Sequence, residues 1–176
     1  MLATLITISL FYKLDNVSKK IFLSFKLPEG RGDMSRLKFN NKVINFVDES
    51  YNSNPLSLKT ALSNFSKIIS KNNFKHVLLG DMLELGKHSY DHHKSIIKII
   101  NKLKIDKVHI YGNYIKKTYE GLSDRKKGLV LTNISQINEL INKTLSNNDY
   151  LMVKGSNSTG LYRKSQLLKL NKLNAL

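Results

Sequence analysis

Short apolar runs alternate with longer amphipathic stretches from residue 37 onward, and this alternation constrains the fold most. The runs have the length and composition of buried strands and cover residues 43–47, 76–79, 107–111, 129–131 and 150–153. The stretches around them repeat apolar residues at helical spacing and cover residues 56–70, 89–104, 113–121, 135–145 and 161–170. Strands that are apolar throughout and separated by helices indicate a mostly parallel sheet covered on both faces. The sequence therefore predicts an open α/β fold.

The first 25 residues predict two further helices. Residues 2–12 are largely apolar, and Val17, Ile21 and Phe25 recur every fourth residue. The first stretch has the length of a signal-peptide core, but no basic residue precedes it and no cleavage pattern of small residues follows it. We therefore favour a buried helix over a signal. No segment reaches the roughly 18 apolar residues that a membrane-spanning helix needs.

The strong positive charge of the chain raises the question of a nucleic-acid partner. It has 29 Lys and Arg against 13 Asp and Glu, a formal net charge of +16, which is compatible with nucleic-acid binding. Only four of the basic residues are Arg, and the lysines are spread along the whole chain among Asn and Ile. A general compositional drift explains this better than one selected basic face, so we expect no nucleic-acid partner. The absence of cysteine excludes disulfides, thiolate metal sites and thiol nucleophiles.

Polar residues follow the predicted strands where each strand ends. They form four loops, at residues 48–55, 80–81, 112–113 and 154–160. The carboxyl ends of parallel strands meet at one edge of a sheet, where ligands of open α/β folds bind. The loop at 155–160 has the position of a phosphate cradle, but the chain contains neither GxxxxGK[ST] nor GxGxxG. The pattern predicts a binding edge without identifying the ligand.

Two other patterns have weaker interpretations. His88, His92 and His93 with Asp91 have metal-ligand spacing. His93, however, shares the phase of the apolar stripe, so a packed histidine beside a solvated turn is favoured over a metal site. The tripeptide at residues 31–33, Arg-Gly-Asp, is treated as a coincidence. No G-x-S-x-G element supports hydrolase chemistry.

Four blocks of sequence together resemble one family. They are Gly-Arg-Gly at 30–32, VDESYNSNP at 47–55, LGDMLELG at 79–86 and VKGS at 153–156, with His93 in the helix that follows the third block. Their order and spacing are similar to those of the C-terminal part of the Mur ligases, above all the MurF branch, the UDP-N-acetylmuramoyl-tripeptide–D-alanyl-D-alanine ligases. The resemblance implies a Rossmann-like C-terminal Mur ligase domain at residues 30–176. It also implies a truncated helical tail of the central ATPase domain at residues 1–29.

The resemblance further implies a cytoplasmic step of peptidoglycan synthesis. ATP would phosphorylate the terminal carboxylate of UDP-N-acetylmuramoyl-tripeptide, and the amine of D-alanyl-D-alanine would attack the acyl phosphate. The P-loop, the Mg²⁺ ligands and the UDP-binding domain of the family belong upstream of these residues, so Met1 looks like an internal methionine. We therefore expect no catalytic residue and no metal ligand here. The missing N-terminal and central domains would be partners, and the chain alone would be inactive.

The resemblance also implies roles for individual residues. Arg31 would approach the nucleotide phosphates, and Asp48 would bind the ribose. Tyr51 and Asn52 would line the ATP-facing crevice. Lys154 and Ser156 would face the dipeptide or the acyl phosphate. From its position alone, Asp48 could equally favour a helix dipole. The alternative function is a free-standing basic α/β module that binds nucleotide or nucleic acid.

Overall fold

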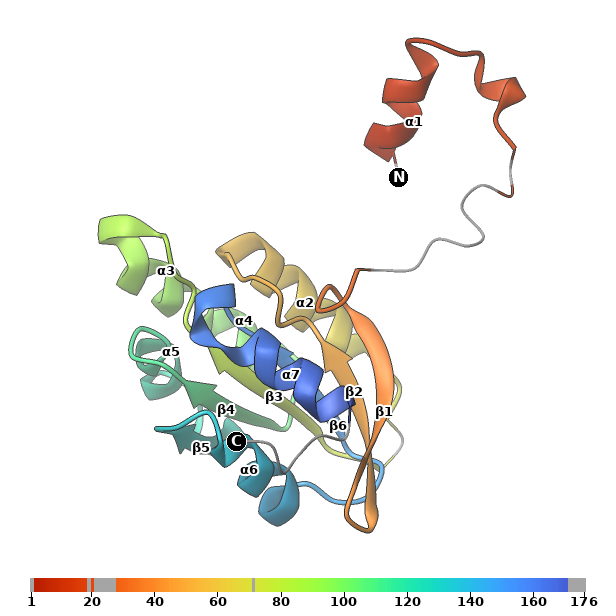
Figure 1. The fold of residues 1–176 in the computed structure, drawn as a ribbon. Coiled ribbons are helices and arrows are strands. Elements are labelled where there is room, and N and C mark those ends of the chain that lie inside the picture. The colour runs from red at the N-terminus through yellow and green to blue at the C-terminus, as the bar shows by residue number, and fades with distance from the viewer. Residues whose placement is uncertain (1, 19, 21–27, 71, 171–176) are drawn as a thin grey trace.

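The computed structural model describes residues 2–18, 20, 28–70 and 72–170, and its centre is a six-stranded sheet (Figure 1). The order across the sheet is β1-β2-β6-β3-β4-β5. Strand β1 is antiparallel to β2, and the other neighbouring pairs are parallel. The mostly parallel α/β fold is thus confirmed. The strands are β1 (Asp33–Phe39), β2 (Lys42–Asp48), β3 (Lys75–Gly80), β4 (Lys107–Tyr111), β5 (Lys127–Leu131) and β6 (Tyr150–Lys154).

Helices cover both faces of the sheet, and the path of the chain decides which face each one takes. After β5 the chain turns back and enters β6 between β2 and β3. Because parallel crossovers are right-handed, this return places its helix on the face opposite to the earlier ones. Side chains of α2, α4 and α5 pack in one apolar cluster and those of α6 and α7 in the other (Figure 1). The helices are α2 (Pro55–Lys67), α3 (Ser89–Ser95), α4 (Ile97–Lys102), α5 (Lys116–Glu120), α6 (Gln136–Thr144) and α7 (Leu161–Lys169), and 3-10 turns lie at η3 (Gly86–His88), η4 (Asp124–Lys126) and η5 (Asn157–Thr159).

Strand β3 shows how the sheet serves both clusters. All six of its residues are buried. Val77 and Leu79 point into the cluster of α2 and α4, whereas Leu78 points into the cluster of α6 and α7. The consecutive apolar residues 77–79 thus serve both faces of the sheet, as the continuous run in the sequence indicates.

Strand β1 is the part of the described sheet that the sequence analysis did not predict. Its residues alternate, with Leu37 and Phe39 buried and Met34, Arg36 and Lys38 exposed. This alternation is typical of an antiparallel strand with one solvated face. Continuous apolar runs are the signature of parallel strands, so the search for them does not detect a strand of this kind.

The predicted helix at residues 89–104 is divided into α3 and α4 at Ile96. The backbone carbonyl of His93 accepts a hydrogen bond from Thr118 Oγ1 at 2.7 Å. The same carbonyl accepts from the amide of Ile96 at 3.4 Å, three residues ahead instead of four. A side chain that inserts at a helix carbonyl in this way bends the helix.

The start of the chain agrees only in part with the prediction. Helix α1 (Leu2–Ser9) is present, and Figure 1 shows it apart from the sheet. The predicted burial of this stretch is wrong, because Ile6 is 56% and Leu10 is 74% exposed. The second predicted helix, at 15–25, is wrong where the structure describes it, because η1 (Leu14–Asn16) is a single 3-10 turn and Val17 is extended. Ile21 and Phe25 lie outside the described residues. Among the described residues, no helix is long and apolar enough to cross a membrane.

Candidate functional site

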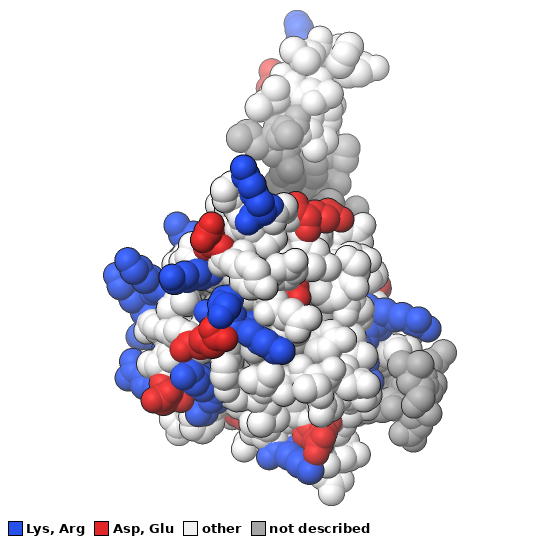
Figure 2. Space-filling model, turned by 90° about the vertical axis from the view of Figure 1, so that its left-hand side faces the viewer, with Lys and Arg blue, Asp and Glu red and all other residues white. Residues whose placement is uncertain are grey.

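The loops that follow the strands meet at one edge of the sheet, as the sequence predicts. Strand β6 lies between β2 and β3, and the helices that follow these neighbours cover the face opposite to α7. A crevice outside the carboxyl ends forms where adjacent strands send their connections to opposite faces. Figure 2 views the molecule from this side, and acidic and basic side chains are interspersed there around a largely uncharged centre. We call this region the carboxyl-end edge.

Asp48 ends β2 and is completely buried at this edge. One carboxylate oxygen accepts hydrogen bonds from the amide and the hydroxyl of Ser50, and the other accepts from Gln166 Nε2 at 3.0 Å. Lys169 Nζ lies 2.8 Å from Asp48 and 2.9 Å from Asp33. Burial lowers the pKa of Lys169, but its bonds to Asp48 and Asp33 outweigh this and raise it. The carboxylate of Asp48 thus ties the end of β2 to α7, and its role toward a ribose stays a prediction.

Glu49, the next residue, presents the accessible carboxylate of this loop. Its side chain is 24% exposed, and Oε2 lies 3.6 Å from Lys154 Nζ. Burial raises the pKa of Glu49, although Lys154 opposes the shift. Sequence reasoning overlooked Glu49, yet the signal was available, because successive side chains of a strand point to opposite sides.

Lys154 and Ser156 are buried and connect the loops of the edge. Lys154 Nζ donates to the carbonyl of Asn52 at 2.9 Å, and burial lowers its pKa against the opposing effect of Glu49. The hydroxyl of Ser156 accepts from the amide of Leu83 at 2.8 Å and donates to the carbonyl of Ser53 at 3.3 Å. These bonds join the loops after β2, β3 and β6. The predicted contact of both side chains with the dipeptide stays a prediction.

Arg31, Tyr51 and Asn52 are brought together on the surface of the edge. Arg31 Cζ lies 4.4 Å above the ring of Tyr51, a cation-π distance. The ring of Tyr51 packs edge-on against Tyr162 with centroids 5.4 Å apart. The amide of Tyr51 donates to the carbonyl of Gly30 at 3.0 Å, which holds the two loops side by side. The arrangement offers a guanidinium, an aromatic face and an amide to solvent.

A pocket of about 440 Å³ opens at the same edge, between the ends of β4 and β5. Asp81 forms part of its wall, and its carboxylate accepts from the amides of Asn113 at 2.9 Å and Ile115 at 2.8 Å. Gly112 has φ +136° and lies so close that a Cβ there would be 2.4 Å from the Asp81 carboxylate. The glycine is therefore needed for Asp81 to fix the loop after β4. Other lining residues offer polar groups: Lys116, Thr132, Ser158 and Thr159.

His93 is a fully buried histidine, as the packing interpretation predicted. Its Nδ1 donates to the carbonyl of Ser89 at 2.7 Å, and its Nε2 accepts from the amide of Met82 at 3.0 Å. Burial lowers the pKa of His93, which keeps it neutral in this arrangement. His88 instead lies at the surface, 3.7 Å from Asp91. No group of three His, Cys, Asp or Glu side chains in the described ranges could hold a metal ion.

Known proteins are similar to this chain in sequence and in fold. The family model described as "Mur ligase, glutamate ligase domain" matches residues 34–157. The UDP-N-acetylmuramoyl-tripeptide–D-alanyl-D-alanine ligase of Rickettsia prowazekii is 27% identical over 157 residues, covering 89% of this chain and 34% of that protein. The enzyme of that name from Treponema pallidum is 28% identical over 129 residues, covering 72% of this chain and 28% of that protein. The chain thus spans about a third of the length of these relatives.

Solved structures give the same picture for the fold. The MurF ligase of Thermotoga maritima in complex with ADP aligns with a TM-score of 0.75 at 20% identity, covering 97% of this chain and 37% of that one. A MurF structure from Acinetobacter baumannii aligns with a TM-score of 0.71 at 22% identity, covering 96% and 35%. The sheet and its flanking helices therefore have the arrangement of the matching part of these structures.

Proposed function

Since the chain belongs to the Mur ligase family through its glutamate ligase domain, we propose that it is the C-terminal part of an ATP-dependent ligase. The ligase would add D-alanyl-D-alanine to UDP-N-acetylmuramoyl-tripeptide, a cytoplasmic step of cell-wall synthesis. The names of the relatives that cover most of this chain support the choice of reaction. The observation that carries the proposal is the carboxyl-end edge, where the Arg31–Tyr51 pair and a separate polar pocket lie on the same side of one sheet.

The reaction requires two charged reactants to be held beside an acyl phosphate. ATP phosphorylates the terminal carboxylate of the tripeptide, and the amine of the dipeptide attacks the carbonyl carbon, so that phosphate leaves and an amide bond forms. Orientation of the amine converts a bimolecular step into one within a complex, which is a large part of such catalysis. Positive groups that face the developing negative charge lower the barrier further.

On the nucleotide side, we assign Arg31 to the phosphates, with Tyr51 and Asn52 beside the nucleotide. Glu49 supplies the carboxylate available to a ribose, because Asp48 is fully engaged by Gln166 and Lys169. Asp48 then acts as a positioning residue that holds the loop carrying these groups. The described residues contain no group of three His, Cys, Asp or Glu side chains that could hold a metal ion, and no step of this proposal uses a Mg²⁺ ion held by this chain.

On the dipeptide side, we assign the 440 Å³ pocket. A zwitterionic dipeptide needs a cation for its carboxylate and hydrogen-bond acceptors for its ammonium group. Lys116 supplies the cation, and the hydroxyls of Thr132, Ser158 and Thr159 supply acceptors. Lys154 and Ser156 position the adjoining loops. A pocket of this size suits a small ligand.

The test is a site-resolved titration of the 176-residue chain by nuclear magnetic resonance. D-alanyl-D-alanine should shift the amides of Gly112, Asn113 and Thr132, and ADP should shift those of Arg31 and Tyr51. L-alanyl-L-alanine is the matched control and should shift the first group less. Shifts confined to other regions, or equal shifts by both dipeptides, would contradict the assignment of the pocket.

A further inference from the structure

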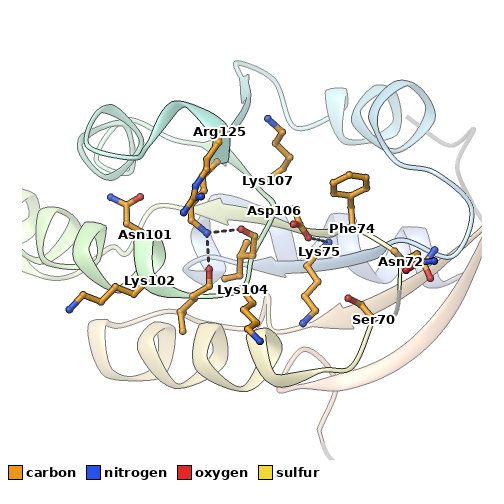
Figure 3. Close-up of a pocket in the computed structure, with 14 residues that line it drawn as sticks. Ser70, Asn72, Phe74, Lys75, Asn101, Lys102, Lys104, Asp106, Lys107 and Arg125 are labelled. Carbon is orange, nitrogen blue, oxygen red and sulfur yellow. Dashed lines mark hydrogen bonds between the residues drawn. The ribbon is translucent and has the colours of Figure 1, made fainter.

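A second pocket lies at the opposite edge of the sheet, which we call the amino-end edge (Figure 3). It has a volume of about 680 Å³ and lies between the ends of α2 and α4, the starts of β3 and β4, and turn η4. Six of the 14 residues that line it are basic and one is acidic, whereas 29 of the chain's 176 residues are basic. The concentration of charge here therefore exceeds the general lysine bias of the sequence. The basic residues are Lys75, Lys102, Lys104, Lys107, Arg125 and Lys126.

These cations are not paired with Asp or Glu side chains in the part of the chain that the structure describes. None of the six forms an ion pair among the described residues, and all 13 Asp and Glu of the chain are in the described part. The acidic lining residue, Asp106, accepts a hydrogen bond from the backbone amide of Lys75 at 2.7 Å. The lining of the pocket thus carries net positive charge, because six basic side chains stand against the single carboxylate of Asp106.

Two of the lysines donate hydrogen bonds to backbone carbonyls at the helix ends that face the pocket. Lys75 Nζ donates to the carbonyl of Ser66 in the last turn of α2 at 2.8 Å. Lys126 Nζ donates to the carbonyls of Leu103 and Ile105 after α4, both at 2.7 Å. The carboxyl end of a helix is the negative end of its dipole and repels anions. Because the two buried ammonium groups occupy these carbonyls, the helix ends no longer oppose an anion in the pocket.

Three other side chains are free to bind. Lys102, Lys104 and Arg125 are exposed. Figure 3 shows Lys102 and Lys104 along one side of the pocket and Arg125 across from them. We propose that this pocket is a second ligand site, which binds a small polyanion with several phosphate groups through Lys102, Lys104 and Arg125.

The form of the pocket favours a small ligand over a nucleic-acid strand. Its volume falls within the range of small-molecule sites, roughly 300–1,000 Å³. Phe74 is the single aromatic residue among those that line it. Proteins that bind single strands use several aromatic side chains as stacking platforms. Three asparagines also line the pocket, of which Asn73 and Asn101 already donate to the backbone carbonyls of Asn147 and Gly121.

Isothermal titration calorimetry of the full 176-residue chain with sodium tripolyphosphate tests the proposal. The double variant K102Q/K104Q should bind the probe about tenfold more weakly, because it loses two charge pairs. The matched control K38Q/K59Q removes the same charge from exposed lysines outside the pocket and should change the affinity less than twofold. Circular dichroism verifies that both variants fold.

Three outcomes would overturn the proposal. One is the absence of measurable binding by the unaltered chain. Another is an equal loss in both double variants, because that pattern indicates attraction to net charge alone. The third is tighter binding of a single-stranded oligothymidylate than of tripolyphosphate, lost in K102Q/K104Q, which would assign the pocket to nucleic acid.

Discussion

Helix ends at the carboxyl-end edge and at the amino-end edge of the sheet are contacted by side chains of opposite charge. At the carboxyl-end edge, Asp48 and Asp81 accept hydrogen bonds from backbone amides of the loops where helices begin. At the amino-end edge, Lys42, Lys75 and Lys126 donate to backbone carbonyls where α6, α2 and α4 end. The direction of the helices explains the contrast, because every crossover helix starts at one edge and stops at the other.

This difference separates the charged groups that are bound to helix ends from those that remain available to a ligand. Backbone amides at helix starts are donors, and carbonyls at helix ends are acceptors. The carboxylates and lysines that bind them are fixed by the fold and are not free for ligands. The groups available at each edge are the neighbours of the fixed ones, Glu49 and Arg31 on one side and Lys102 and Arg125 on the other.

The largest effect should come from Asp48. The substitution Asp48→Ala removes a fully buried partner of Lys169 and leaves that ammonium to Asp33 alone. We expect a loss of about 4 kcal/mol in the free energy of unfolding, as for other buried pairs. Urea unfolding followed by circular dichroism measures it. The control Asp124→Ala breaks the exposed pair with Lys127 and should cost less than about 0.5 kcal/mol. Equal losses would mean that burial at this edge does not matter.

A smaller loss is expected from Gly112→Ala. The new Cβ would lie 2.4 Å from the Asp81 carboxylate, and φ is +136°. We expect a loss of about 3 kcal/mol in the free energy of unfolding. Gly86→Ala is the matched control, because φ there is +60° and nothing lies within 4 Å of the new atom. It should cost about 1 kcal/mol, and a similar cost at both positions would contradict the close approach of Asp81.

The sequence predicted the strands of the binding edge well, because buried parallel strands carry their signal locally. It also located the loops that meet there. It did not predict that the Asp48 carboxylate is buried and bound by other side chains of the chain. The groups responsible, Gln166 and Lys169, come from α7, 118 or more residues further along the chain.

The amino-end edge was harder to predict for a related reason. Lys75 and Lys126 look like any other lysine of this lysine-rich chain. Their burial becomes visible only when the ends of α2 and α4 are placed beside the starts of β3 and β4. A charge pattern that arises from several distant segments leaves no local motif. The sequence analysis expected no basic face because it could not place these distant segments beside one another.

Acid should lower the free energy of unfolding through two buried histidines of the sheet, His76 in β3 and His109 in β4. His109 Nδ1 accepts from the amide of Leu129 at 2.9 Å, so its proton lies on Nε2, 3.1 Å from His76 Nδ1. Burial lowers the pKa of His109 to about 3, and burial also lowers that of His76. Because the unfolded chain binds protons near pH 6.5 and the folded chain does not, stability falls as the pH drops from about 6.5 toward 3. His109 contributes about 2 kcal/mol of loss at about pH 5 relative to pH 8.

Urea titrations at the two pH values measure this dependence. His109→Gln should reduce this dependence, even if the variant is less stable at both values, and His76 and His93 account for the dependence that remains. His88→Gln removes an exposed histidine and should leave the dependence unchanged. A pH dependence that survives His109→Gln in full would assign the titration to other groups, with His76 and His93 as the next candidates.

The smallest effects test the two edges against each other. Arg31 and Arg125 are both exposed arginines, one at each edge. Arg31→Gln should weaken ADP binding, followed at the amides of Tyr51 and Asn52, about fivefold, because one exposed charge contact is lost. It should leave tripolyphosphate binding unchanged. Arg125→Gln should do the reverse. If either variant weakens both ligands equally, the two edges do not form separate sites, and the polyphosphate would share the surface of the nucleotide. If each variant weakens only its own ligand, opposite ends of the same sheet bind phosphate independently. One end then binds through groups beside helix starts, and the other through basic side chains beside helix ends whose carbonyls are already bound by lysines.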